Sequence, residues 1–360
     1  MDDRQRAHLV AMLAFLKLTR PLNLVIIVFT MVAMRYGVVG AYLDFESAGM
    51  RAMANDPQGT LVLGVPDNTL DHAFPSLLFW LLVLGTVLIA AGGNVINDYF
   101  DTRIDRVNKP DEVIVGRSVR RRVAMAGHFV LSAIGLLLCT VVAWRSGQWK
   151  WLVIPVFAVG TLWYYSTRMK RSFLIGNGAV ALLSALVPLV VGLFEITALA
   201  QRYPATVELD TTIGERIPVG FDFNLPWFWI LGFAGFAFLT TLVRELQKDL
   251  ADVKGDQADG CRTLPIVVGQ RWAKAIAVGY LLITLLGVLA VRMLILHDRL
   301  SYWYIGFLVI GPLLLSMGFT YNAVVRREFT IAGNLMKVAM VIAIAYAFLL
   351  RHTLWNPALL

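Results

Sequence analysis

Two short acidic motifs contain the residues of this chain that are best suited to chemistry. The first follows a long apolar run and contains Asn97, Asp98, Asp101 and Asp105. The second repeats the aspartate spacing 151 residues later, at Asp249, Asp252 and Asp256. Positions i, i+3 and i+7 of a helix share one face, so the carboxylates of each motif are expected to point the same way. Converging carboxylates need a counter-charge, which a hard divalent cation such as Mg²⁺ supplies.

The pairing of the motifs indicates what they bind. One acidic triplet could arise by chance, but two in register, each at the end of an apolar run, indicate a shared metal-dependent site. A diphosphate is the ligand expected for six carboxylates at the ends of membrane helices, because Mg²⁺ bridges carboxylate and phosphate oxygens and stabilises charge on a leaving group. All six aspartates are therefore predicted to be catalytic and to bind metal. The apolar residues behind them would hold a lipid tail.

Basic and hydroxyl side chains could complete a diphosphate site. The segment after residue 163 contains Tyr165, Ser166, Arg168 and Lys170, and Lys248 directly precedes the second motif. The two basic residues of the first segment could bind diphosphate. They could also serve only to set the membrane topology. Arg35 lies well inside an apolar run, where an uncompensated charge is costly, so it is expected to pair with an acid outside this site.

The elements that must position these residues are membrane helices. Hydrophobic residues make up 58% of the chain and charged residues 16%, whereas soluble domains are roughly 45–50% apolar. The net charge of +8 is spread over short segments between apolar runs, which argues against a nucleic-acid partner. Windows of about 20 apolar residues can each span a bilayer. Nine occur, at 22–43, 74–97, 121–143, 150–166, 173–200, 225–246, 273–296, 302–322 and 332–353.

The distribution of basic residues predicts the orientation of these nine helices. Of the lysines and arginines at or beyond the ends of the spans, 22 fall on one side and 7 on the other. The positive-inside rule then places the N-terminus and both acidic motifs on the cytoplasmic face. Residues 1–21 are interpreted as an interfacial amphipathic segment. The loops 44–73 and 201–224 are expected to be solvated lids on the outer face.

The offset of 151 residues also relates the spans to one another. Shifting spans two to five by this offset approximates spans six to nine, so residues 1–360 are predicted to form one domain of one helix followed by two parallel four-helix repeats. Sites often lie at repeat interfaces. The predicted fold is an all-α polytopic membrane protein with a central lipid-lined cavity. An ion-coupled transporter is an alternative, although its acids would lie near the midplane and not at span ends.

These motifs resemble those of the UbiA-type intramembrane prenyltransferases, a nine-helix family. That family carries an N-D-x-x-D-x-x-x-D motif after the second helix and D-x-x-D-x-x-x-D after the sixth, matched here by Asn97 to Asp105 and by Asp249 to Asp256. Further similarities are Arg20-Pro21, Asn108-Lys-Pro110, Tyr165-Ser166 with Lys170, and Arg262-Thr-Leu-Pro265.

The resemblance implies Mg²⁺-dependent transfer of a prenyl group from a polyprenyl diphosphate in a prokaryotic cytoplasmic membrane. It implies that the aspartates hold the metal, that Asn97 orients the first motif, and that Lys170 and Arg168 stabilise the departing diphosphate. An acid of the second motif could take up the released proton. The sequence is most similar to the branch of the family that makes digeranylgeranylglyceryl phosphate from geranylgeranyl diphosphate and geranylgeranylglyceryl phosphate. Aromatic quinone or pigment precursors remain the alternative acceptors, since the sequence departs from the family pattern after Pro110.

Overall fold

The computed structural model describes residues 3–54, 61–62, 69–203, 206–210 and 216–353. Over these ranges, eight helical segments are long and apolar enough to cross a membrane, which confirms a helical, polytopic protein. They are Pro21–Arg51 (within α2 Pro21–Val32, η1 Ala33–Val39 and α3 Gly40–Ala54), α4 Ser76–Asn108, α5 Arg121–Arg145, α7 Ile175–Arg202, α8 Asn224–Ala258, α10 Gln270–Leu294, Arg299–Asn322 (α11 Arg299–Trp303, η6 Tyr304–Val309 and α12 Ile310–Asn322) and α13 Arg326–Thr353.

The segment predicted to be the fourth span differs in form. It consists of a 3₁₀ turn, η4 Trp149–Leu152, followed by the 15-residue helix α6 Val153–Thr167. At 1.5 Å per residue α6 alone is about 22 Å long, shorter than the roughly 30 Å hydrocarbon core of a bilayer. This segment is therefore not among the eight long helices.

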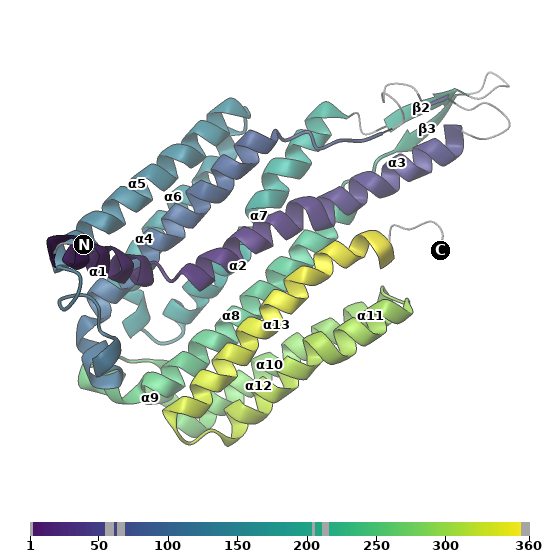
Figure 1. Ribbon diagram of the computed structural model, residues 1–360. Helices are drawn as coiled ribbons and strands as arrows, with labels where there is room; N and C mark the ends of the chain where they lie inside the picture. Colours follow the sequence, from purple (N-terminus) through teal and green to yellow (C-terminus); the bar gives the residue numbers. More distant parts are fainter. Residues whose placement is uncertain (1–2, 55–60, 63–68, 204–205, 211–215, 354–360) are drawn as a thin grey trace.

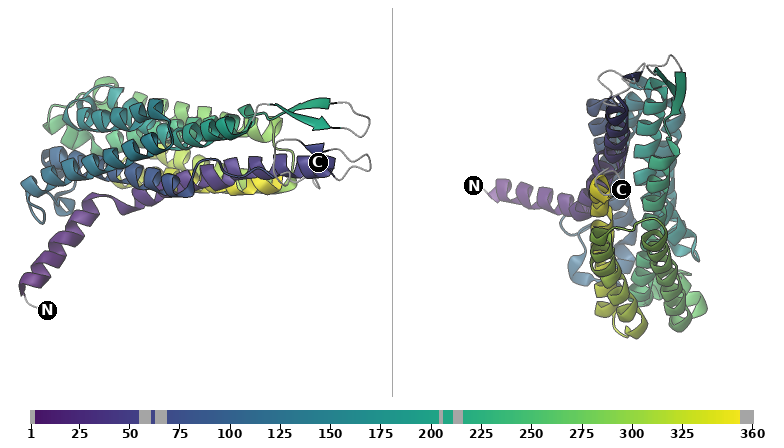
Figure 2. Two further views of the ribbon diagram at one scale, coloured as in Figure 1. Left: turned by 90° about the horizontal axis from the view of Figure 1, so that it is seen from above. Right: turned by 90° about the vertical axis from the view of Figure 1, so that its right-hand side faces the viewer.

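The long helices run side by side (Figure 1). In that view α4–α7 lie on one side of the continuous α2–η1–α3 helix, and α8–α13 lie on the other. The helix α1 Asp3–Leu18 projects away from the bundle (Figure 2), and its apolar side chains Leu9, Met12 and Leu16 are exposed. Exposed apolar side chains also cover the outward faces of the bundle, as on α10 at Ile283 and Leu286. Such extensive apolar surface is suited to contact with lipid.

Small residues let α4 approach its neighbours closely. A Cβ added at Gly92 would lie 2.7 Å from Ser132 Oγ on α5, and one at Gly93 would lie 2.6 Å from Leu162 Cδ2 on α6. Both distances are shorter than ordinary carbon contacts, which lie near 3.5–4.0 Å. The glycines thus fix how closely α4 packs, directly before the first acidic motif.

The two long loops contain structure that the sequence did not predict. In the first loop, α3 continues to Ala54 and a short strand follows, β1 Leu61–Val62; the second loop contains β2 Thr206–Asp210 and β3 Arg216–Gly220. The strands form an antiparallel sheet in the order β1-β2-β3. Backbone hydrogen bonds therefore connect loop 44–73 with loop 201–224. The remaining parts of both loops, 55–60, 63–68, 204–205 and 211–215, lie outside the described residues.

A buried ion pair neutralises the charge inside the first span. Arg35 and Glu195 of α7 are 1% and 0% exposed and form an ion pair, which confirms the expected pairing of Arg35 with an acid. A second guanidinium nitrogen of Arg35 donates to the Phe74 carbonyl oxygen at 2.8 Å. His72 Nδ1 lies 3.4 Å from Glu195 Oε2. The π-helical turn η1 contains Arg35, so the helix departs from regular α geometry where this charge is buried.

Candidate active site

Each acidic motif occupies the last turns of a long helix. The helix α4 continues without interruption to Asn108, and α8 continues to Ala258, so both sets of aspartates have the helical spacing that the sequence predicted. Within the first motif, Asn97 Nδ2 donates to Asp101 Oδ2 at 2.7 Å, one helical turn away. Asn97 therefore holds the Asp101 carboxylate in place.

Basic side chains from two other segments pair with the first motif. Arg20, which precedes α2, donates to Asp98 Oδ1 at 2.5 Å, and Lys170 forms a half-buried ion pair with Asp101. Burial lowers the pKa of Arg20, but the carboxylates of Asp98, Asp101 and Glu245 together outweigh this effect and raise the pKa above its ordinary value. Arg20 therefore stays charged. Two of the predicted site residues, Asp101 and Lys170, are thus brought into direct contact.

The backbone is strained at two positions that border this group. Among the described residues other than glycine, Arg20 with φ of 55° and Leu174 with φ of 58° are the two with positive φ. Arg20 is the N-cap of α2, and Leu174 is the N-cap of α7, four residues after Lys170. Left-handed backbone at residues with a Cβ is costly and gathers at functional sites. Here one of the two residues, Arg20, is itself the basic residue that pairs with Asp98.

The second motif has different partners. Asn177 Nδ2 on α7 donates to Asp249 Oδ2 at 2.8 Å, and Thr263 Oγ1 donates to Asp256 Oδ2 at 3.4 Å. Arg326, at the start of α13, places its Nε 3.4 Å from Asp252 Oδ1. Elements on three sides therefore fix the three carboxylates.

Asn108 connects the two motifs directly. From the end of α4, its Nδ2 donates to the Asp252 carbonyl oxygen at 3.1 Å, and its Oδ1 accepts from the Gly255 amide at 3.0 Å. Its own carbonyl oxygen accepts a hydrogen bond from Arg326. A Cβ at Gly255 would lie 2.3 Å from Asn108 Nδ2, so only glycine allows this approach. We call these two hydrogen bonds between Asn108 and α8 the Asn108 clamp.

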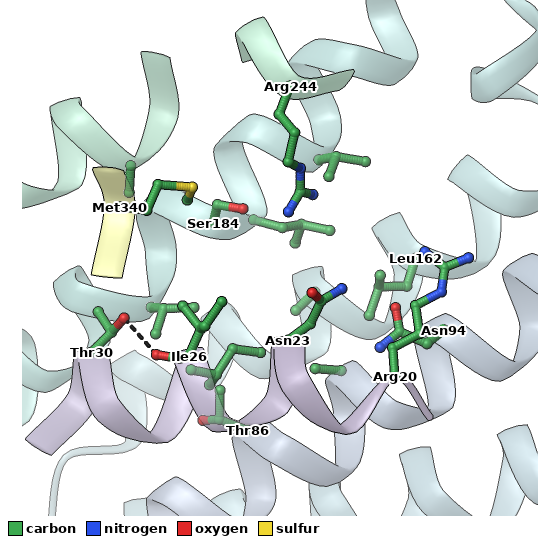
Figure 3. Close-up of a pocket in the computed structure, with 18 of the residues that line it drawn as sticks. Arg20, Asn23, Ile26, Thr30, Thr86, Asn94, Leu162, Ser184, Arg244 and Met340 are labelled. Carbon is green, nitrogen blue, oxygen red and sulfur yellow. Dashed lines mark hydrogen bonds between the residues drawn. The ribbon is translucent and has the colours of Figure 1, made fainter. Parts of the chain in front are cut away.

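A cavity of about 250 Å³ opens beside the motifs. Its polar end includes Asn97, Tyr165, Arg244, Glu245 and Lys248, and its other walls are apolar, with Ile26, Leu162, Val187, Phe233 and Ile344. Figure 3 shows Arg244 on one side of the space and Asn23 and Arg20 on the other. A charged end and an apolar interior suit a molecule with an anionic head and a hydrocarbon tail.

The remaining predicted residues lie less centrally. Ser166 is buried, and its hydroxyl donates to the Leu162 carbonyl oxygen at 2.9 Å, within its own helix. Arg168 is exposed. Asp105 is half-buried, and the acids of its own motif and two lysines are its charged neighbours. Of the predicted substrate-binding residues, Asn97, Tyr165 and Lys248 therefore line the cavity, and Lys170 contacts Asp101 of the first motif.

Several residues at the site were not among the predicted site residues. Arg20 and Asn108 belong to segments that resemble the family, but neither was expected to contact an acid. The signal for Asn177 was a polar side chain inside an apolar span, and the signal for Glu245 was a carboxylate one turn before Asp249. Arg326 had no signal in its spacing, because its partner lies 74 residues earlier.

Comparison with known proteins decides the family. Residues 69–330, which contain both acidic motifs, match the model of the UbiA prenyltransferase family. The chain belongs to the UbiA prenyltransferase family. It is therefore an integral membrane prenyltransferase, and the ion-coupled transporter alternative is set aside.

Two relatives of this UbiA-family chain bear the same name. It is 28% identical over 342 residues to the digeranylgeranylglyceryl phosphate synthase of Thermococcus kodakarensis, covering 94% of this chain and 97% of the relative. It is 31% identical over 268 residues to the enzyme of the same name from Thermococcus gammatolerans, covering 73% and 72%. A solved structure of a UbiA homolog from Aeropyrum pernix K1 has the same fold, with a TM-score of 0.54 at 15% identity, over 88% of this chain and 97% of that one.

The oxygen atoms of this UbiA site fit a hard divalent cation. Two buried oxygens, Asn97 Oδ1 and Asp252 Oδ1, accept no hydrogen bond. Carboxylate and amide oxygens are the ligands that Mg²⁺ prefers. Throughout the part of the chain that the structure describes, however, no three acidic, histidine or cysteine side chains gather closely enough to hold one ion. The partners of Asp98, Asp101 and Asp249 explain this arrangement, because each draws its carboxylate towards a different element.

Proposed function

We propose that this prenyltransferase transfers a geranylgeranyl group from geranylgeranyl diphosphate to geranylgeranylglyceryl phosphate, a step of ether-lipid synthesis. The observation that carries the proposal is the cavity, where an anion-binding end formed by Lys248 and Arg20 meets an apolar interior. Its similarity to relatives named digeranylgeranylglyceryl phosphate synthase supports this choice of acceptor.

The reaction exchanges one carbon–oxygen bond for another. The bond between C1 of the prenyl group and the diphosphate oxygen breaks, and the electron pair leaves with the diphosphate. The acceptor hydroxyl oxygen then bonds to C1, and its proton passes to a carboxylate of the second motif. The products are the ether and diphosphate. Because the cation formed at C1 would react with water, the apolar walls at Leu162 and Phe233 protect it.

The residues of the site have separate tasks in this reaction. Lys170, Lys248 and Arg20 balance the charge of the departing diphosphate. Asn97 and Asn177 hold Asp101 and Asp249 at fixed positions. We propose that the aspartates of both motifs, Asp98, Asp101, Asp105, Asp249, Asp252 and Asp256, hold Mg²⁺. When bound, this ion neutralises phosphate oxygens and stabilises the leaving group.

We further propose how this enzyme lies in a prokaryotic cytoplasmic membrane. The excess of basic residues beyond the ends of α4 and α8 supports an active site at the cytoplasmic face, with a cytoplasmic N-terminus and α1 in the interface. The η4 turn would add about 8 Å to the length of α6. Together the two elements approach the roughly 30 Å that a ninth membrane-spanning segment needs. Helices α4–α7 and α8–α13 would then be the two parallel repeats.

The test uses purified protein in detergent with radiolabelled geranylgeranyl diphosphate, Mg²⁺ and a panel of acceptors. Geranylgeranylglyceryl phosphate is expected to be prenylated, and 4-hydroxybenzoate is not. Transfer to phenolic acceptors alone would overturn the acceptor assignment.

The site assignment is tested in the same assay with Lys170→Met. Removing the cation that faces Asp101 is expected to lower the rate of diphosphate release about 100-fold, the usual effect of losing one preorganised charge-stabilising donor. Lys254→Met is the matched control, because Lys254 is an exposed lysine on α8 that lines no part of the cavity. Equal rates for wild type and Lys170→Met would contradict the proposed site.

A further inference from the structure

A group of basic side chains lies at the cavity on the side of α8 and α13. Arg244 of α8 lines the cavity and points into it in Figure 3, across from Arg20. Arg244 has one carboxylate partner, Glu245 Oε1 at 2.7 Å, and Arg20 has one, Asp98. Each of the two arginines is therefore already paired with a neighbouring carboxylate.

A third cation, Lys337 of α13, has Arg244 and Arg20 among its charged neighbours, although it does not itself line the cavity. A Cβ built at Gly333 lies 3.9 Å from Arg244 Cγ, and Met340 lines the cavity. Positions 333, 337 and 340 share one helical face, at i, i+4 and i+7. Lys337 is therefore placed along α13 between the contact with Arg244 and the cavity wall.

The charge of Lys337 is not balanced locally. It is repelled by the charges of Arg244 and Arg20 and attracted by that of Glu245, which Arg244 already pairs with. Across the described ranges, the Lys337 ammonium makes no hydrogen bond and no ion pair with another residue. Like charges that converge in a membrane protein are costly unless an anion or water balances them. A bound anion would balance this group of cations.

We propose that Arg244 and Lys337, across the cavity from Arg20, bind the phosphate monoester of the prenyl acceptor. This inference rests on the proposed function and names a residue set for its second substrate. The donor diphosphate belongs beside the acidic motifs, where Lys170 pairs with Asp101 and Arg20 pairs with Asp98.

The surroundings of this group fit a phosphate attached to a hydrocarbon chain. Asn23 and Ser184 line the cavity near Arg20 and Arg244 in Figure 3 and supply neutral hydrogen-bond donors. Beyond Met340 the same α13 face continues to Ile344, an apolar wall. An aromatic acid such as 4-hydroxybenzoate brings one negative charge, whereas a phosphate monoester brings up to two. The two cations Arg244 and Lys337 therefore favour the phosphate acceptor.

The first experiment measures binding and so does not depend on turnover. The Kd of geranylgeranylglyceryl phosphate and of its dephosphorylated alcohol is measured without donor, in wild type, Lys337→Met and Arg244→Gln. Wild type is expected to bind the phosphate form at least about tenfold more tightly, the effect of one charge-assisted contact. Both variants are expected to lose most of that preference. Lys337→Arg should restore it, and Arg327→Gln, at an exposed position of α13, should leave it unchanged.

The second experiment is kinetic. Lys337→Met and Arg244→Gln are both expected to raise KM for geranylgeranylglyceryl phosphate about tenfold while KM for geranylgeranyl diphosphate stays within twofold. A phosphate preference that is the same in wild type and in Lys337→Met would overturn the inference, as would a change confined to the donor KM. Absence of turnover with every glyceryl acceptor would instead refute the proposed function, and the binding measurements would still decide the inference.

Discussion

Replacing Gly255 by alanine tests whether the Asn108 clamp holds the two acidic motifs together. The added Cβ would lie 2.3 Å from Asn108 Nδ2 and 2.6 Å from its Cγ. Because carbon contacts are comfortable near 3.5–4.0 Å, the Asn108 side chain must move by roughly 1 Å or more. It then loses its hydrogen bonds to the Asp252 carbonyl oxygen and to the Gly255 amide.

The expected magnitudes for stability and activity differ. Two hydrogen bonds contribute about 1–3 kcal/mol to folding stability. Replacing a helical glycine by alanine stabilises the helix by about 1 kcal/mol. The net loss of stability in Gly255→Ala is therefore small, about 0–2 kcal/mol. A shift of about 1 Å between catalytic groups can lower a rate about 100-fold. We therefore expect kcat to fall about 10- to 100-fold in a protein that remains folded.

The assay is diphosphate release under saturating donor and Mg²⁺, together with thermal unfolding in the same detergent. Gly235→Ala is the matched control, because it lies on the same helix and its added Cβ meets nothing within 4 Å. Adding Asn108→Ala to Gly255→Ala should cause little further loss, since the clamp is already broken. Wild-type kcat in Gly255→Ala would refute the argument that the clamp positions the motifs.

Two further predictions concern buried groups. Arg35→Met leaves the Glu195 carboxylate buried without its cation, so it should lower the free energy of unfolding by about 3–5 kcal/mol. In thermal unfolding, the double variant Arg35→Met/Glu195→Gln should be more stable than Arg35→Met. A double variant less stable than Arg35→Met would contradict this reasoning. Burial, together with the nearby Asp256 carboxylate, raises the pKa of the Cys261 thiol to about 11. In a Cys139→Ala background, the rate of Cys261 alkylation should therefore be low at pH 8 and should rise about tenfold per pH unit up to pH 10. Equal alkylation rates in folded and denatured protein would disprove the raised pKa.

The local parts of the site could be predicted from the sequence, because helical spacing and apolar runs act over short distances. The aspartates of both motifs lie on continuous helices as expected, and Arg35 has the acidic partner that its burial required. The contacts between distant segments could not be predicted in this way. Nothing in the spacing indicates that Asn177 reaches Asp249, since that contact depends on how α7 packs against α8.

The length of α6 and the strands of the outer loops could not be predicted, for related reasons. The apolar run at 150–166 has the composition of a span, but its first residues form a 3₁₀ turn. The strand β1 is only two residues long and exists by pairing with β2, about 150 residues away along the chain. Short strands have little local signal of their own.

The π-helical turn η1 also determines the rotational phase of the helix on either side of it. A π turn closes i→i+5 hydrogen bonds and so takes up roughly one residue more than an α turn. One residue corresponds to about 100° of rotation in an α-helix. Converting η1 to regular α geometry without removing a residue would therefore turn α2 by about 100° relative to α3. With α3 held in place, Asn23 and Ile26 would swing away from the cavity, although neither residue had been altered.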